Sequence, residues 1–129
     1  YKMPVLMAFY NHGNVRMEVS EAELLASWKE FFSTGTNWKD LEKEITYEEY
    51  RKISDKNHIQ KIMKMPVHFL LKSGEEFFVK KDGAALALRD EMEEIVKEPV
   101  LAEQMKDVIE YRAMDYYRRR YKEKIKALL

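Results

Sequence analysis

The chain has 129 residues, of which 46% are hydrophobic and 12% aromatic, enough for the core of one domain. Its 23 lysine and arginine residues balance its 23 aspartate and glutamate residues, so the overall charge indicates no class of partner. It has no cysteine, which excludes disulfides, thiolate metal sites and a cysteine nucleophile, and which fits a cytoplasmic location.

Two further features of the whole chain bear on its setting. No apolar run approaches the length of a membrane-spanning helix, so a membrane partner is not expected. The chain begins at Tyr1 rather than at methionine, and we expect residues 1–129 to be a single domain taken from a larger protein.

The first predicted element is a β-hairpin over residues 4–19. Residues 5–10 are apolar on both faces of the predicted strand, whereas residues 15–19 alternate apolar and polar side chains, so the first strand is predicted to be the more buried of the two. The Asn-His-Gly-Asn sequence at 11–14 is rich in residues that tolerate positive φ, as a hairpin turn requires.

Helix-capping patterns follow this hairpin. Ser20 and Glu23 have the spacing of a capping box, and apolar residues follow them at helical intervals. Thr46 and Glu49 repeat the pattern for a second helix, and Asn57 is predicted to cap a third.

Pro66 is the difficult residue of the third helix. It has no amide hydrogen, so it fits the first turn of a helix better than the interior. Residues 57–73 are therefore predicted to form two helices, or one helix sharply kinked at Met65–Pro66, and Gly74 is predicted to end the second part.

A second hairpin is predicted from residues 76–81 and 84–88, joined by the strong turn signal Asp82–Gly83. Asp90 is predicted to cap a helix through Lys97, and a last helix is expected from residue 98 to beyond residue 122. The predicted fold is α+β, mostly helical with two β-hairpins. Helices followed directly by a hairpin resemble a winged-helix arrangement, in which the hairpin is the wing.

No set of residues points to catalysis. None of the three histidines stands three or four residues from another, so no helical metal pair exists. The chain also has no nucleophile elbow, phosphate-binding glycine loop or dinucleotide fingerprint. We therefore expect no catalytic residue, metal or cofactor, and an independent hydrolase is the least favoured function.

Positive charge is concentrated in the middle of the chain. Residues 51–72 contain six lysine and arginine residues against one aspartate, and His58 and His68 would add charge near or below neutral pH. In a winged helix the recognition helix would fall here, and Lys80 and Lys81 would lie near the wing tip. Lysines three or four residues apart would line one side of a continuous helix, although Pro66 is predicted to break that line.

The predicted nucleic-acid contacts in this part are Lys56, Lys61, Lys64, His68, Lys72, Lys80 and Lys81. Lysines of this kind bind phosphates by neutralisation and counterion release. The alternative is the lysine-rich, solvated side of a core helix.

A second basic stretch is Asp115–Lys122, with the sequence DYYRRRYK. On a helix its three consecutive arginines spread over about 200°, so they cannot serve one flat surface. Asp115 would face two of them, which favours a packed terminal helix with ion pairs, while arginine beside tyrosine also suits phosphate contact and base stacking. Arg118, Arg119 and Arg120 are therefore included among the predicted nucleic-acid contacts.

Residues 4–24, PVLMAFYNHGNVRMEVSEAEL, and residues 107–121, DVIEYRAMDYYRRRY, resemble a known protein region. They are similar to the C-terminal accessory region that follows the motor in restriction-type DEAD/DEAH-box helicases, bacterial proteins of superfamily II. The resemblance implies a parent that is an ATP-dependent helicase or restriction enzyme, with DNA or the parent's motor domains as partners. It implies no motor activity for this chain, because the phosphate-binding GKT or GKS motif and the acidic magnesium motif are absent.

Two functions remain open from the sequence. The first is a non-catalytic nucleic-acid-binding accessory domain of such a parent. The second is a protein-interaction or dimerisation domain that docks on other domains of its parent or forms a homodimer. Eight methionines and many aromatic residues supply an adaptable apolar surface for the second function.

Overall fold

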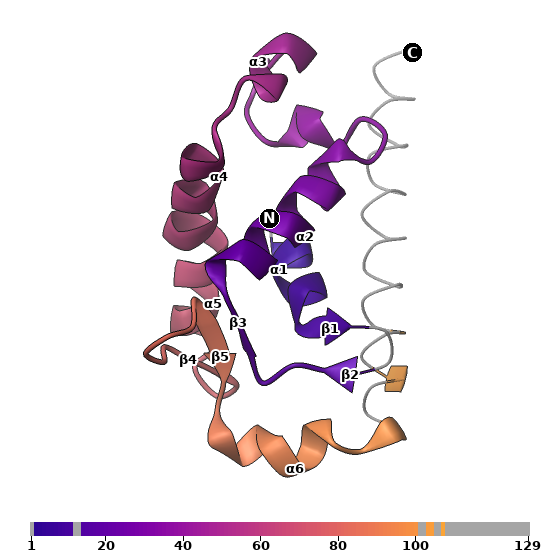
Figure 1. The fold of residues 1–129 in the computed structure, drawn as a ribbon, viewed down its shortest axis with the longest axis vertical. Helices are drawn as coiled ribbons and strands as arrows, with labels where there is room; N and C mark the ends of the chain where they lie inside the picture. The colour runs from indigo at the N-terminus through magenta and orange to yellow at the C-terminus, as the bar shows by residue number, and fades with distance from the viewer. Residues whose placement is uncertain (1, 12–13, 101–102, 105–106, 108–129) are drawn as a thin grey trace.

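The computed structural model describes residues 2–11, 14–100, 103, 104 and 107 (Figure 1). Most of the predicted last helix, with Arg118, Arg119 and Arg120, lies outside the described residues. The elements are α1 (Lys2–Phe9), β1 (Tyr10–Asn11), β2 (Asn14–Val15), β3 (Glu18–Val19), α2 (Glu21–Ser33), η1 (Asn37–Asp40), α3 (Tyr47–Arg51), α4 (Asp55–Ile62), η2 (Met63–Val67), α5 (His68–Ser73), β4 (Phe78–Val79), β5 (Leu86–Leu88), η3 (Asp90–Met92) and α6 (Glu93–Val96).

The first segment is a helix, so the strand predicted at its start is wrong. Val5, Ala8 and Phe9 are spaced three and four residues apart and are buried together on one side of α1. Pro4 is tolerated because it lies in the first turn, where backbone amides have no intrahelical acceptor. The hydroxyl of Ser27 in α2 donates to the carbonyl of Pro4 at 2.5 Å, which ties the two helices together.

Of the predicted first hairpin, only the antiparallel pairing of residues 10–11 with residues 14–15 is confirmed. β1 and β2 are antiparallel two-residue strands in which Tyr10 pairs with Val15. β3 leaves this hairpin and joins a different sheet.

The prediction for α2 is confirmed in detail. The Ser20 side chain accepts a hydrogen bond from the Glu23 amide, and the Glu23 carboxylate accepts one from the Ser20 amide, which completes the capping box. Leu24, Trp28 and Phe32 then point into the core at helical spacing.

Helix α3 begins at the predicted cap, but α4 begins earlier than expected. The Thr46 side chain accepts from the Glu49 amide. The N-cap of α4 is Ser54, whose hydroxyl accepts from the amide of Asn57, so the prediction of Asn57 as the cap is wrong.

The prediction of two separate helices over residues 57–73 is wrong, although the regular α-helix is interrupted at Met65–Pro66, as the alternative of a single irregular helix expects. α4, η2 and α5 follow one another from Asp55 to Ser73, and η2 is a π-helical turn with Pro66 inside it. Proline has no amide hydrogen for the i→i−4 hydrogen bond of an α-helix, and its ring would clash with the carbonyl of residue i−4. A π turn is wider than an α turn and does without that hydrogen bond, so it accommodates Pro66. The helix ends as predicted at Gly74, whose amide donates to the carbonyl of Leu70.

The main sheet has three antiparallel strands in the order β3-β5-β4. The second predicted hairpin is thereby confirmed, with Phe78 opposite Leu88, although its strands are shorter and its connection is longer than expected. Gly83 in that connection has a φ of +83°, which a residue with a Cβ atom adopts only with strain.

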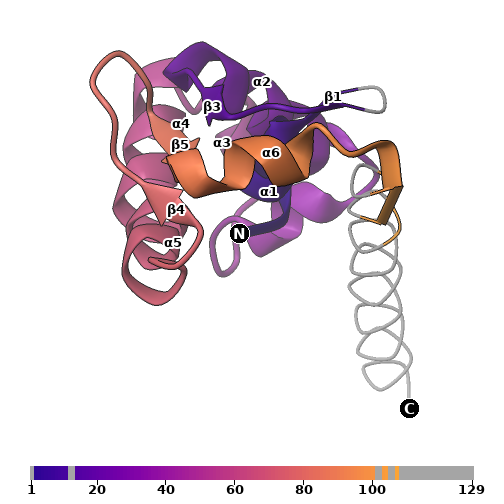
Figure 2. The same cartoon turned by 90° about the horizontal axis from the view of Figure 1, so that it is seen from below.

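The described elements form a mixed α+β fold, as predicted. Figures 1 and 2 show α1 and α2 at the centre, the α4–η2–α5 helix along one side and α6 across one end. Trp28, Phe32, Ile62 and Leu86 are among the fully buried residues that join these elements. Asp90 opens the short η3 turn but does not cap it with its side chain, contrary to prediction.

Candidate functional site

The continuous α4–η2–α5 helix has one buried and one exposed side. Ile62, Pro66, Val67 and Leu70 are buried against the core. His58 lies on the same side and is also buried. The orientation of the whole helix is therefore fixed by its apolar residues, and the opposite side is left to solvent.

Lysine residues gather on the exposed side. The helix continues through Pro66, and Lys64, His68 and Lys72 lie on its exposed side, opposite the buried residues. Lys56, about two helical turns before Lys64, is also exposed, and Lys61 is half-buried.

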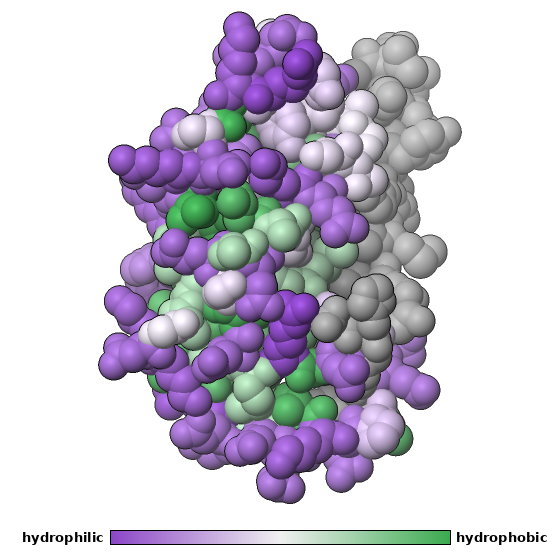
Figure 3. All heavy atoms as spheres, viewed as in Figure 1, coloured by the Kyte–Doolittle hydropathy of each residue, from purple (hydrophilic) through white to green (hydrophobic). Residues whose placement is uncertain are grey.

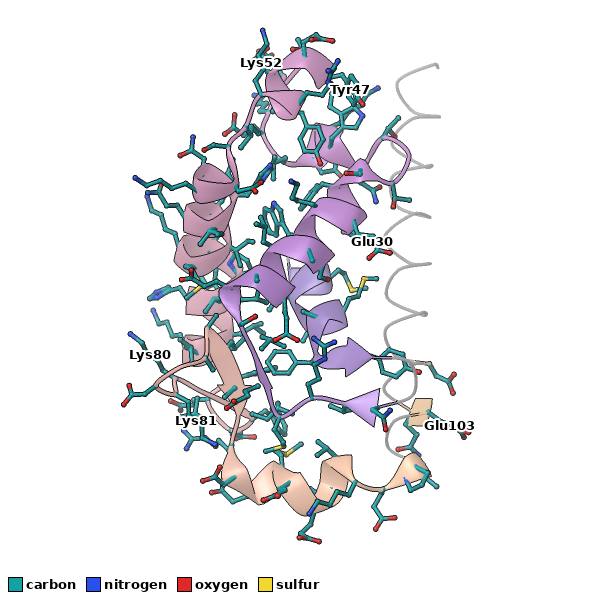
Figure 4. All side chains as sticks on the ribbon, viewed as in Figure 1. Glu30, Tyr47, Lys52, Lys80, Lys81 and Glu103 are labelled. Carbon is teal, nitrogen blue, oxygen red and sulfur yellow. The ribbon has the colours of Figure 1, made fainter. Side chains whose placement is uncertain are left out.

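The connection between β4 and β5 adds two lysines on the same side of the molecule. Both ribbon views place this connection on the side formed by α4, η2 and α5 (Figures 1 and 2). Lys80 is exposed and points outward from it (Figure 4), and Lys81 is half-buried. The exposed side of α4–η2–α5 together with this connection is termed the basic face; its members from the predicted set are Lys56, Lys61, Lys64, His68, Lys72, Lys80 and Lys81.

Ion pairs reduce the free charge of the basic face at two points. Lys61 Nζ lies 2.6 Å from the Glu42 carboxylate, and Lys81 Nζ lies 2.6 Å from that of Asp90. The hydrogen bond to Asp90 raises the pKa of Lys81. Among the described residues, Lys56, Lys64, Lys72 and Lys80 form no ion pair, so these exposed lysines are free to meet an external anion.

The acidic residues near the basic face lie mostly toward its ends. Asp55, the one acidic residue of the helix, pairs with Lys29 of α2 at 3.0 Å. Glu75, Glu76 and Asp82 are exposed around the β4–β5 connection and offset its two lysines. In the space-filling view, most side chains along the left edge of the molecule, where α4, α5 and β4 lie in Figure 1, are hydrophilic (Figure 3). The helix therefore carries more net positive charge than the β4–β5 connection.

His58 does not contribute charge in the way the sequence suggested. Its ring is 3% exposed, and its Nδ1 accepts a hydrogen bond from the Trp28 indole at 3.0 Å. Burial first, and then the nearby charge of Lys29, lowers the pKa of His58. It is a packing residue that holds α4 against α2.

Apolar residues lie among the lysines, which sequence reasoning missed. Met65 is 39% exposed and Phe69 is 45% exposed on the same helix. In a regular α-helix, residue 69 would lie nearly above residue 62, which is buried. The π turn contains one additional residue per turn, so Leu70 takes the buried position and Phe69 is turned to the exposed side. A proline within a helical pattern is the sequence signal for such a turn.

The described residues contain no group of three or more histidine, aspartate or glutamate side chains that could hold a metal ion. Within the same residues, no helix is both long enough and apolar enough to span a bilayer. Comparisons with protein-family models, with curated proteins and with solved structures found no match. The function is therefore inferred from the residues and their positions.

Proposed function

We propose that the chain is a non-catalytic nucleic-acid-binding domain that contacts DNA through the basic face. The observation that carries this proposal is the unbroken α4–η2–α5 helix, which places Lys64, His68 and Lys72 together on an exposed side. Lys80 of the β4–β5 connection extends the same side. Ammonium groups arranged in this way neutralise successive phosphates and release their counterions.

The order of the elements supports a winged-helix interpretation. Of the main sheet, one strand, β3, precedes α2, and two strands follow the long helix as a hairpin. The early strand pairs with the second strand of that hairpin, in the order β3-β5-β4. In this interpretation α4–η2–α5 is the recognition helix and the β4–β5 connection is the wing. The parent of such a domain would be a larger helicase or restriction-type protein, in line with the resemblance of residues 4–24 and 107–121.

Binding of labelled DNA at a series of salt concentrations tests this proposal. We expect measurable binding at about 50 mM salt and a steep loss by about 200 mM, because each phosphate contact contributes about −0.9 to the slope of log K against log salt. The double variant K64E/K72E should weaken binding by at least about tenfold and reduce the magnitude of that slope by about 2.

The matched control is K43E/K52E, which makes the same change of charge elsewhere. Both lysines are exposed, and Lys52 lies at the α3 end of the molecule, away from Lys80 (Figure 4). This variant should retain most of the binding. An absence of binding at low salt, or equal losses in the two double variants, would refute the proposal.

The alternative function, docking on another protein surface, has one observation in its favour. Ile95 of α6 and Val100 are 46% and 62% exposed, so both aliphatic side chains are accessible to a protein partner. Dynamic light scattering over a wide range of concentration tests the homodimer form of this function. A dimer that the Ile95→Lys variant abolishes would support it, and a monomer at all concentrations would exclude it.

A further inference from the structure

Phe69 is the most unusual member of the exposed side of the long helix. Its ring is 45% exposed, although a phenyl ring gains about 1.5–3 kcal/mol from full burial. Its neighbours along the helix are Met65 one turn before it and Lys72 one turn after it. The ring of His68 lies beside it, with the two ring centroids 6.0 Å apart.

The position of this ring depends on the π turn. A regular helix of 3.6 residues per turn would bring Phe69 to the side of Ile62, where it would meet the core. η2 instead places Leu70 there and leaves Phe69 beside Lys72 and Lys64 on the outer side. The fold therefore presents an aromatic face in the midst of positive charge.

The charge around Phe69 favours a nucleic acid over a protein as its ligand. Lysine is depleted at protein–protein interfaces, whose central residues exclude unpaired charge. Lys64 and Lys72 form no ion pair with a described residue and would have to be desolvated by an apolar partner. A nucleic acid offers both a π face for the ring and phosphates for the lysines.

The exposed ring also discriminates between forms of nucleic acid. In a duplex the faces of the bases are stacked on each other, and a side chain on a helix reaches only base edges and backbone. In a single strand the bases are free to stack on aromatic side chains while lysines track the phosphates.

We propose that the basic face binds single-stranded nucleic acid, with Phe69 stacked on a base and Lys64 and Lys72 on the adjoining phosphates. This inference rests on the proposed function and names the substrate class of the same surface. It adds a contact that is independent of salt to the salt-dependent contacts of the lysines.

The test compares a thymidine oligonucleotide of about 15 nucleotides with a duplex of the same length, by fluorescence anisotropy at fixed salt. We expect wild type to bind the single strand more tightly. F69A should weaken single-strand binding about 5- to 20-fold and change duplex binding by less than about twofold. F69L should behave like F69A because it keeps apolar area but no π face, whereas F69W should retain binding.

Two further measurements separate stacking from damage to the fold. Thermal unfolding of F69A and F69L should show the same single transition as wild type, since the side chain is half-exposed. The tryptophan emission of F69W should be quenched by the oligonucleotide, as an indole stacked on a base would be. Unchanged emission at saturation would count against stacking.

The outcomes also separate this inference from the proposed function. If wild type binds neither single strand nor duplex, both fail. If K64E/K72E weakens binding while F69A leaves single-strand binding unchanged, only the stacking of Phe69 is refuted. If F69A leaves oligonucleotide binding intact but alters the oligomeric state, Phe69 is a protein contact and the inference is overturned.

Discussion

The indole Nε1 of Trp28 donates a hydrogen bond to Nδ1 of His58 across 3.0 Å inside the core. The bond joins α2 to the first turns of the long helix. It exists only while His58 is neutral, because a protonated imidazole has no acceptor nitrogen. The attachment of the long helix to the core is therefore sensitive to acid.

The first prediction concerns this pH dependence. Burial lowers the pKa of His58 in the folded state, so the unfolded state binds its proton more readily. The contribution of His58 to stability is complete above the ordinary histidine pKa of about 6.5 and is lost progressively as the pH falls below it, at up to about 1.4 kcal/mol per pH unit. Urea unfolding of wild type at a series of pH values from about 8 to about 5 measures this loss.

His58→Gln supplies the comparison for this measurement. A glutamine can accept from the Trp28 indole but does not titrate. Part of the fall in the free energy of unfolding between about pH 7 and about pH 5 should therefore disappear in this variant. His68→Gln, which removes an exposed histidine, is the matched control. A pH profile of His58→Gln that superimposes on wild type would contradict the assignment.

The second prediction tests the helical state of the first segment. In a strand, Met7 and Phe9 would point to the same face, whereas in α1 Phe9 is 1% exposed and Met7 is 36% exposed. Phe9 also packs edge-on against Phe78 of β4, with centroids 5.6 Å apart. Phe9→Ala should therefore lower the free energy of unfolding by about 3–5 kcal/mol and Met7→Ala by less than about 1 kcal/mol. Similar losses in both variants would favour a strand.

The third prediction concerns the junction between the long helix and the hairpin. A Cβ atom at Gly74 would lie 2.8 Å from the carbonyl oxygen of Leu70 and 3.1 Å from the ring of Phe78. Gly74→Ala should cost about 1–3 kcal/mol, because backbone cannot move aside as a flexible side chain can. Glu76→Ala, at an exposed position nearby, should cost less than about 0.5 kcal/mol in the same denaturant series.

The fourth prediction concerns charge release at the basic face. Glu42 holds Lys61 at 2.6 Å, so Glu42→Gln both frees that lysine and removes a negative charge. We expect DNA binding to tighten about two- to fivefold at low salt and the gain to vanish at high salt. Glu30→Gln makes the same charge change on α2, well away from Lys80 (Figure 4), and should alter affinity by less than about twofold. Equal gains in both variants would mean that only net charge matters.

The parts of the fold that the sequence predicted are those set by local interactions. The capping box of Ser20 and Glu23 and the turn at Gly83 depend on residues a few positions apart, and both are present. Residues 5–9 were misassigned because an apolar run fits a buried strand and a buried helix equally well. The packing of α1 against α2 and the sheet, which decides the matter, involves residues distant in sequence.

The sequence predicted the charged residues of the candidate site, but not which residues after Pro66 face outward. Lys61, Lys64, His68 and Lys72 could be listed from their spacing, and in the structure Lys64, His68 and Lys72 are exposed while Lys61 is half-buried. Phe69 could not be found by counting along a regular helix, since its exposure requires the additional residue of the π turn. Arg118, Arg119 and Arg120 remain sequence predictions outside the described residues.

The pairing of β3 with β5 has a consequence for how the chain folds. It joins Val19 to Leu86, residues near opposite ends of the described chain, and the helices from α2 to α5 lie between them in sequence. Closing so long a loop costs conformational entropy before the strand contacts can stabilise it. This pair of strands should therefore form last, after the local helices. Because β3 and β5 come from distant parts of the chain, cleavage of one peptide bond between α2 and α3 would leave two fragments, each of which supplies strands that the other needs to form the main sheet.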